Sequence, residues 1–343
     1  MRFGIGIGRT LDAAGAARLA QHADELGYDH CTFIESQNLC RDSTIMMALA
    51  AARTSRIRLG HAVTNPYTRH AAVLANTIAT IDELAPGRVF LGIGAGGSAV
   101  AMVGRNPRPL TELGDYVEFF RDFTAGKEAT WQGLKMRSEW ARRDIPVLLG
   151  THGSRSCRLA GQVADGVFLP GFAPEIVKWK REQVAAGAAA AGRGPGSLEL
   201  WSRGAVFVHE DADHAREYVR SYAATSAYFL WKSALVRQST QSQALREAMP
   251  EPLLAEMARL AVEYAWDQHE VVGAPHAAAL SAELIDCFAI YGPQSRCLER
   301  LHELESLGVD RASFVLYGVP DQQAMISRFA ESVAQRFRSD VTA

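Results

Sequence analysis

Short apolar runs alternate with longer stretches of helical period along most of the chain. The clearest example lies within 56–97, where apolar runs at 57–63 and 89–93 enclose an alanine-rich segment that leads to Pro86-Gly87. Short apolar runs bounded by glycine and proline, with a helical pattern between them, predict a strand–helix–strand unit of buried parallel strands. Polar clusters follow both runs, at the end of the strands where parallel α/β proteins carry their functional sites.

Eight strands can be placed in this way, and their expected ranges are 3–7, 28–34, 57–63, 89–93, 145–150, 166–169, 199–208 and 312–317. The segment 127–140 is expected to be a short hairpin outside the core, and 288–293 to lead into a helix that ends near Leu307. Residues 211–285 break the alternation with several helical stretches. The pattern therefore favours a TIM-like (β/α)8 barrel over a doubly wound sheet, in a single domain 1–343, with 211–285 as a helical insertion between strands seven and eight.

The net charge of about −2 gives no global field that would recruit nucleic acid or an anionic membrane surface. No uninterrupted apolar run approaches the ~20 residues of a membrane helix. The five cysteines are scattered without metal-ligand spacing, and the chain enters its first strand without a signal-peptide layout. These features predict a cytoplasmic enzyme with reduced thiols, a small-molecule substrate, and neither nucleic-acid nor membrane partners.

Two strand ends are candidates for ligand binding. The run at 94–97, Gly-Ala-Gly-Gly, lacks the full dinucleotide-binding spacing, and plain turn chemistry is the more common meaning of a glycine-rich strand end. The run at 150–155, Gly-Thr-His-Gly-Ser-Arg, joins a strand to a helix N-terminus, where free N–H groups and the helix dipole favour an anion. Arg155 adds a positive charge suited to a phosphate oxygen, although the run could also be an ordinary capped loop.

Three histidines, His61, His70 and His152, lie at or just beyond predicted strand ends. None has a partner at metal-ligand spacing, so no metal site is expected. Each could act as a general acid or base, or could only make structural hydrogen bonds. The sequence contains neither a nucleophile elbow nor a phosphate-binding P-loop, so no motif supports a hydrolase or NTPase function.

Several longer motifs resemble the bacterial luciferase-like monooxygenase superfamily, and most closely its coenzyme F-420-dependent oxidoreductases that are similar to methylenetetrahydromethanopterin reductase. The motifs are VTNPYTRH (63–70), IDELAPGRVFLGIGAG (81–96) and LAGQVADGVFLP (159–170), supported by FIES…RD (33–42) and FAIYGP (288–293). The resemblance implies a TIM-like barrel with a helical insertion, often a homodimer. It also implies a flavin or deazaflavin lying across the C-terminal ends of the strands.

The resemblance also implies positions for the cofactor. A non-prolyl cis peptide at Ala62–Val63 would lie in a bulge of strand three beneath the ring, and the phosphate would sit on Gly153, Ser154 and Arg155. The cofactor-binding residues expected in all are Ala62, Val63, Thr64, Asn65, Gly96, Gly97, Ser98, Gly150, Thr151, Gly153, Ser154 and Arg155.

The chain departs from the methanogen reductases at two points. Those enzymes carry a Glu in strand one and an Asp after the fourth-strand glycines, where this chain has Gly6 and Gly97. The proton donors proposed for that reaction are therefore absent, which argues against tetrahydromethanopterin as substrate. The remaining polar residues near the implied ring are Glu35, His61, Asn65 and His152. We take Glu35 and His61 as the catalytic candidates.

The leading hypothesis is hydride transfer between coenzyme F-420 and a small organic substrate, with the cofactor supplying the chemistry. A second hypothesis is a reduced-FMN monooxygenase on the same fold, which oxygen consumption would distinguish. A third is a flavin-binding protein without catalysis, to which the two missing carboxylates lend support. If the chain forms a homodimer, the alanine-rich run 71–79 is a candidate for close helix packing.

Overall fold

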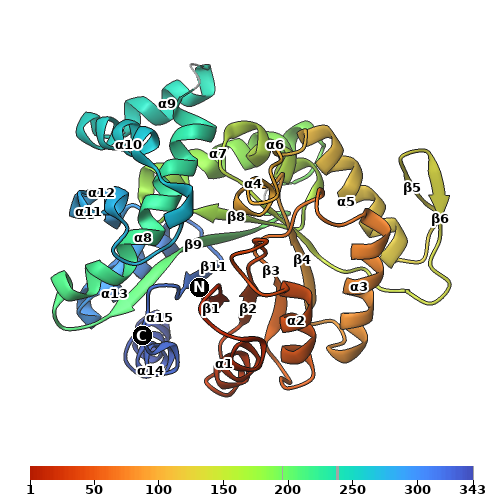
Figure 1. The fold of residues 1–343 in the computed structure, drawn as a ribbon, viewed down its shortest axis with the longest axis horizontal. Coiled ribbons are helices and arrows are strands. Elements are labelled where there is room, and N and C mark those ends of the chain that lie inside the picture. Colours follow the sequence, from red (N-terminus) through yellow and green to blue (C-terminus); the bar gives the residue numbers. More distant parts are fainter. Residues whose placement is uncertain (195, 237–238, 343) are drawn as a thin grey trace.

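A closed ring of eight parallel strands forms the centre of the structure, a computed structural model that describes residues 1–194, 196–236 and 239–342 (Figure 1). The ring strands are β1 (Arg2–Ile7), β2 (His30–Phe33), β3 (Arg58–His61), β4 (Val89–Ile93), β7 (Val147–Gly150), β8 (Gly166–Pro170), β9 (Glu199–Val208) and β11 (Arg311–Val315). The ring closes because β9 pairs with both β8 and β11. The expected TIM-like (β/α)8 barrel is confirmed.

Helices surround the ring and cover its outer face. They are α1 (Ala13–Glu25), α2 (Ser43–Ala51), α3 (Ala71–Leu84), α5 (Leu110–Thr124), α6 (Ser154–Val163), α7 (Pro174–Ala190), α13 (Gln294–Ser306), α14 (Gln322–Arg328), η3 (Phe329–Ala334) and α15 (Gln335–Thr342). The short helix α4 (Ser98–Ala101) instead lies in the loop after β4. Helices α1 and α2 begin where aspartate side chains accept hydrogen bonds from free N–H groups, Asp12 from Gly15 and Asp42 from Thr44 and Ile45. Inside the ring, the side chains of Phe90, Phe168 and Trp201 pack against one another.

One additional strand corrects the expectation for residues 288–293. Instead of only leading into a helix, Ala289–Gly292 forms a strand, β10, that pairs with residues 205–208 of β9. The pairing of β9 with β8 ends at Arg203, so the outer half of this ten-residue strand has free backbone groups on that side. Buried N–H and C=O groups need partners, and β10 supplies them. A strand of four residues, followed at once by Pro293 and a helix, gives a very short sequence signal.

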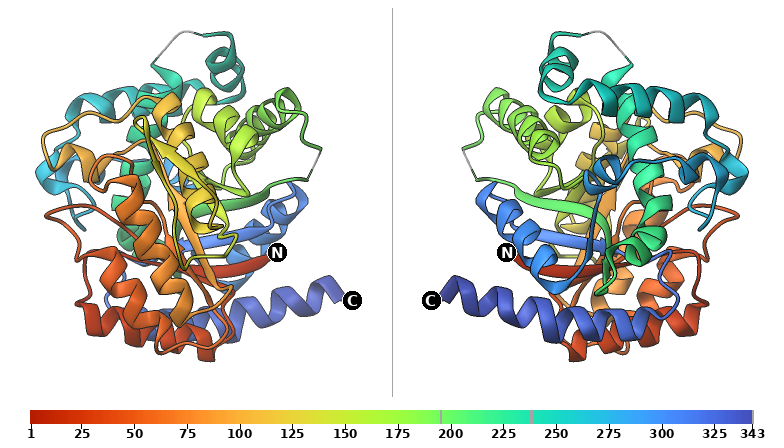
Figure 2. Two further views of the ribbon diagram at one scale, coloured as in Figure 1. Left: turned by 90° about the vertical axis from the view of Figure 1, so that its right-hand side faces the viewer. Right: turned by 90° about the vertical axis from the view of Figure 1, so that its left-hand side faces the viewer.

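The chain between β9 and β10 is helical, as the loss of strand pattern predicted. Its elements are α8 (Ala212–Leu230), η1 (Trp231–Leu235), α9 (Thr240–Ala248), α10 (Glu251–Glu263), η2 (Trp266–Gln268), α11 (Pro275–Ala278) and α12 (Ala282–Asp286). In Figures 1 and 2 this insertion lies beside β9, and its long helix α8 packs directly against β9 and β10. The predicted hairpin, β5 (Ala129–Trp131) and β6 (Leu134–Met136), projects from the opposite side. Among the described residues, no helix is long and apolar enough to cross a membrane.

Candidate active site

Strand β3 ends in a bulge. Its register with β4 is Leu59↔Val89 and Gly60↔Phe90, yet Thr64 then pairs with Ile93, so three residues of one strand oppose two of the other. The peptide bond between Ala62 and Val63, within this bulge, is cis. The expected bulge and its non-prolyl cis peptide are therefore both confirmed.

Glycines on the neighbouring strands make room for this bulge. A Cβ atom at Gly94 would lie 3.2 Å from a Val63 methyl group, and one at Gly150 would lie 2.9 Å from the other. The glycine-rich ends of β4 and β7 thus serve a packing purpose, because they let the Val63 side chain lie between them. They also leave bare backbone beside the bulge, against which a planar ring could lie.

A cavity of about 1610 Å³ opens over the C-terminal ends of the strands. All of the predicted cofactor-binding residues line it, from Ala62 on the bulge to Arg155 on α6. The insertion forms the opposite wall through residues that include Tyr222, Phe229 and Trp266. The cavity is larger than the ~300–1,000 Å³ of an ordinary small-molecule pocket, so it has space for a cofactor and a substrate together.

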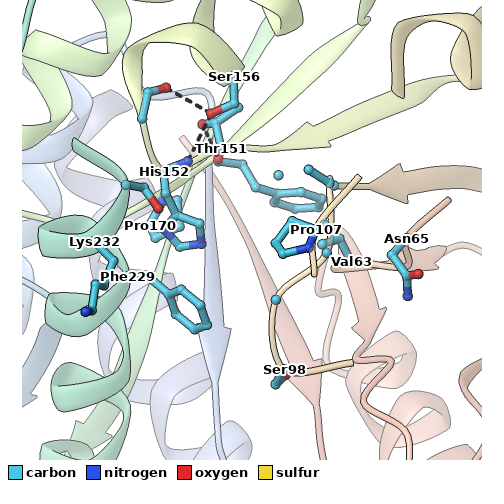
Figure 3. A pocket seen from close by; sticks show the side chains of 18 of the residues that line it. Val63, Asn65, Ser98, Pro107, Thr151, His152, Ser156, Pro170, Phe229 and Lys232 are labelled. Atoms are coloured by element: carbon cyan, nitrogen blue, oxygen red, sulfur yellow. Dashed lines mark hydrogen bonds between the residues drawn. The ribbon is translucent and has the colours of Figure 1, made fainter. Parts of the chain in front are cut away.

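The N-terminus of α6 opens into this cavity. Gly153 is its N-cap, and no side chain caps the helix, so the first N–H groups remain free for a ligand. The Ser156 hydroxyl accepts a hydrogen bond from the His152 N–H and donates one to the Gly153 carbonyl, which fixes the loop (Figure 3). The free N–H groups at this helix N-terminus therefore suit an anion.

The walls of the cavity are strongly positive although the whole chain has a net charge of about −2. Its cationic side chains are Arg105, Arg108, Arg155, Arg158, Arg203 and Lys232, whereas its carboxylates are Glu35 and Glu270. Tyr67 holds two of the cations against its ring, with Arg105 and Arg108 centred 5.7 and 4.3 Å from the ring centroid. An excess of positive charge around one cavity favours a ligand with several negative charges.

Glu35 lies at the end of β2, and its side chain is 3% exposed. One carboxylate oxygen accepts hydrogen bonds from Arg69 Nε at 3.1 Å and from Gln37 Nε2 at 2.9 Å. Arg69 also pairs with Asp42 at 2.7 Å, so the guanidinium holds two carboxylates in place. The other oxygen of Glu35 has no hydrogen-bond partner among the described residues. This second oxygen is itself buried, so it is an unsatisfied acceptor beneath the cavity wall.

The second catalytic candidate is placed differently. His61 is completely buried in β3 and is not among the residues that line the cavity. Neither ring nitrogen has a hydrogen-bond partner in the described part of the chain, and burial lowers the pKa of His61 to about 4. Of the two candidates, only Glu35 reaches the cavity.

The other polar candidates do line it. His152 stacks on Phe229, with ring centroids 5.1 Å apart, and burial lowers its pKa to about 3, so the ring is neutral at physiological pH. Figure 3 shows these two rings on one wall and Val63, Asn65 and Pro107 on the other. The Asn65 amide accepts from the Tyr67 and Thr68 N–H groups, so it shapes the turn after the bulge. No metal-binding cluster of His, Cys, Asp or Glu occurs among the described residues.

Several charged residues in the cavity, among them Arg203 and Glu270, were not anticipated from the sequence. Arg203 is buried in β9, and Glu270 comes from the loop between η2 and α11. A charged residue inside the apolar run 199–208 is a usable signal, because an unpaired buried arginine is costly and therefore commonly functional. Glu270 gave no such signal, since the insertion brings it to the barrel from a segment without a recognisable motif.

Comparison with known proteins agrees with this geometry. A family model described as "Luciferase-like monooxygenase" matches residues 1–311. A 5,10-methylenetetrahydromethanopterin reductase from Methanolobus tindarius is 28% identical over 316 residues, which cover 90% of this chain and 92% of that protein. An F420-dependent glucose-6-phosphate dehydrogenase from Nakamurella multipartita is 29% identical over 181 residues, 47% of this chain and 53% of that protein.

Solved structures share the fold. The coenzyme F420-dependent tetrahydromethanopterin reductase from Methanopyrus kandleri superposes with a TM-score of 0.78 at 21% identity, over 98% of this chain and 99% of that one. An F420-dependent secondary alcohol dehydrogenase, in complex with an F420-acetone adduct, gives a TM-score of 0.73 at 18% identity, over 97% and 98% of the two chains. At these identities the likeness concerns the fold alone.

Proposed function

Since the chain belongs to the luciferase-like monooxygenase family, we propose that it transfers a hydride between coenzyme F-420 and a small organic substrate. The chain is an oxidoreductase, as are its relatives with named activities. The observation that carries the proposal is the positive cavity, which surrounds a free helix N-terminus at the C-terminal ends of the barrel strands.

The residues present fit this cofactor. Coenzyme F-420 carries a phosphate and, beyond it, a chain of carboxylates. We assign the phosphate to the N–H groups of Gly153, Ser154 and Arg155, and the carboxylates to the remaining cations at the cavity mouth. FMN ends at its phosphate and would leave most of these cations without a partner. The positive walls therefore favour F-420 over FMN, in agreement with the names of the relatives.

The bulge and the glycine-rich loops would hold the ring and its ribityl chain. We assign the ring to the Ala62–Val63 bulge, with Thr64 and Asn65 at its edge, and the chain to the backbone of Gly96, Gly97, Ser98, Gly150 and Thr151. The Ser98 hydroxyl accepts a hydrogen bond from Ser36, which ties this loop to the end of β2. When bound, the deazaflavin supplies or accepts the hydride. The protein binds the substrate next to it, excludes water and moves the accompanying proton.

Glu35 is the candidate for proton transfer on the bulge side of the cavity. It lines the cavity, Oε1 is held by Arg69 and Gln37, and the buried Oε2 atom has no hydrogen-bond partner among the described residues. A carboxylate positioned by an arginine in this way keeps its orientation without losing both of its acceptor sites. His61 cannot take this place directly, because it does not line the cavity.

Titration of the apo-protein with F-420, FMN and FAD tests the proposal. We expect F-420 to bind at least tenfold more tightly than FMN, since it can pair with additional cations, each worth roughly 0.5–1 kcal/mol at an exposed site. The preference should shrink as salt is added. Tighter binding of FMN, together with oxygen consumption by the reduced complex, would instead establish the monooxygenase. Cofactor binding without turnover on any substrate would indicate a binding protein.

We also propose that the protein forms a homodimer through α2 and α3. These helices pack against each other and expose the large apolar side chains Ile45 and Leu49 on α2 and Val73 and Leu84 on α3. Exposed apolar side chains that gather on one face commonly mark an interface. Light scattering at micromolar concentration should give twice the chain mass, and Leu49→Lys should shift the protein towards the monomer. A monomeric wild type would exclude this interface.

A further inference from the structure

The insertion places a second carboxyl group in the cavity. Glu270 lines it, and its side chain is 13% exposed. Its backbone has φ of +58°, in the left-handed region that non-glycine residues seldom adopt and that is enriched at functional sites. The carboxylate lies 3.8 Å from His269 Nε2, too far for a hydrogen bond, and it accepts none from a described residue. Glu270 is thus an acidic side chain in the cavity whose carboxylate accepts no hydrogen bond from the described residues.

The guanidinium of Arg203 enters the same cavity from the barrel floor. Its Nη1 lies 3.4 Å from Thr32 Oγ1 and its Nη2 lies 3.4 Å from the Tyr317 hydroxyl, both long for hydrogen bonds. Arginine has five N–H donors, so it retains donors for a ligand. A Cβ atom at Gly6 would lie 3.4 Å from Nη2, an ordinary contact distance, so the guanidinium lies directly beside β1.

Charge and burial around Glu270 suit proton exchange near neutral pH. Burial raises its pKa to about 7, and the positive charges of Arg203 and Arg9 limit the rise. The titratable or charged groups that face it are Arg9, Cys40, Arg203, Tyr264, His269 and Tyr317. A carboxyl that is partly protonated at physiological pH can both donate and accept a proton.

We propose that Glu270 and Arg203 form the substrate subsite for a small carbonyl compound and its alcohol, with Glu270 as the acid–base residue and Arg203 as the oxygen-binding residue. The inference rests on the F-420-dependent hydride transfer proposed above. It names the substrate class and a proton-transfer residue on the wall opposite the bulge.

In the reduction, the carbonyl carbon would accept the hydride that bound, reduced deazaflavin supplies, and the π electron pair would move to the oxygen. Arg203 stabilises the negative charge that develops there, and Glu270 gives the oxygen its proton, then regains one from water. Oxidation of the alcohol is the reverse. An iminium substrate fits this subsite poorly, because it is already cationic and would face Arg203 without ever developing a negative charge.

The first test needs neither substrate nor turnover. With glutamate carboxyl groups labelled by ¹³C, NMR of the apo-protein should show one carboxyl that titrates near pH 7. That signal should vanish in Glu270→Gln and persist in Glu263→Gln, which removes an exposed carboxyl of α10 outside the cavity. The wild-type titration does not depend on the folding of any variant. A wild type without a carboxyl that titrates between about pH 6 and 8 would overturn the role of Glu270.

The second test follows single turnovers of reduced F-420 with a panel of short ketones and aldehydes. Glu270→Gln should slow hydride transfer by ~100-fold and remove the ionisation near pH 7 from the pH profile, whereas Glu263→Gln should match the wild type. Arg203→Met should raise KM and lower kcat, and Arg203→Lys should recover part of both losses. A Glu270→Gln variant with wild-type rate and pH profile would refute the assignment.

The failure of this inference and the failure of the proposed function are distinguishable. A wild type that does not bind F-420 would remove the proposed function, and this subsite with it. A wild type that binds F-420, but whose reduced complex reacts with none of the carbonyl compounds, would overturn the substrate class alone. Glu270→Gln should bind F-420 within a few-fold of the wild type, since Glu270 lies on the insertion wall and the phosphate loop lies on α6.

Discussion

At the scale of single residues, the cavity contains cations whose charge is not neutralised by neighbours. Arg155 is exposed in the first turn of α6 and makes no ion pair or hydrogen bond with a described residue. Arg155→Ala should therefore weaken F-420 binding by roughly 1–3 kcal/mol, the value of one charge-assisted contact, and leave hydride transfer at saturating cofactor nearly unchanged. Arg18→Ala, which removes an exposed charge of α1 far from the cavity, is the matched control. Equal affinities in a fluorescence titration would move the phosphate elsewhere.

Replacing the carboxylate on the bulge side should have the opposite effect: turnover should change, and cofactor affinity should not. Glu35→Gln retains a side chain that Arg69 and Gln37 can hold, so cofactor affinity should stay within a few-fold. If Glu35 rather than Glu270 moves the proton, turnover should fall by ~100-fold or more, the usual loss when an acid–base group is removed. The measurement is steady-state kinetics beside a binding titration. Full turnover in Glu35→Gln, with activity abolished in His152→Ala, would assign the role to the histidine.

At the scale of elements, the phosphate loop of α6 and the insertion are in direct contact. A Cβ atom at Gly153 would lie only 2.5 Å from the Ser233 carbonyl oxygen of η1. Gly153→Ala must therefore displace either the helix N-terminus or the insertion, and F-420 affinity should fall roughly tenfold, the equivalent of one lost charge-assisted contact. Gly114→Ala is the control, because its Cβ would meet Leu159 at an ordinary 3.6 Å. Wild-type affinity in Gly153→Ala would show that the insertion can move away from the added Cβ without disturbing the cofactor site.

The elements also show what the sequence could and could not predict. The eight strands of the ring, the bulge at Ala62–Val63 and the loop at 150–155 were all predictable. Each depends on a local apolar pattern or on a long family motif. β10 was missed because its four residues are a strand only through pairing with β9. Glu270 was missed for a related reason, since its position in the cavity depends on how the insertion packs over the barrel. Local pattern predicted the scaffold, and tertiary packing decided which side chains complete the site.

At the scale of the whole molecule, buried histidines limit the stability of the fold in acid. Burial lowers the pKa of His30, His61 and His269 to about 4 and that of His152 to about 3, from an ordinary value of 6.5. Between pH 6.5 and 4 the unfolded chain therefore binds more protons at these rings than the folded chain does, so the free energy of unfolding must fall as the pH falls through this window. Each ring contributes at most roughly 3–5 kcal/mol. Burial lowers the pKa of His276 as well. Glu270, with its raised pKa, acts in the opposite direction between pH 4.5 and 7, but it is a single group against these five histidines.

Urea unfolding of the apo-protein at about pH 7.5 and about pH 5 measures this effect directly. We expect a markedly lower free energy of unfolding at the lower pH. His61→Leu should lessen the difference, because it removes one titrating ring that has no hydrogen-bond partner among the described residues and replaces it with an apolar side chain of similar size. Leu should thus cost little at pH 7.5 and gain relative stability at pH 5. Equal free energies at the two pH values, or an unchanged difference in His61→Leu, would mean that these rings accept protons within the folded protein.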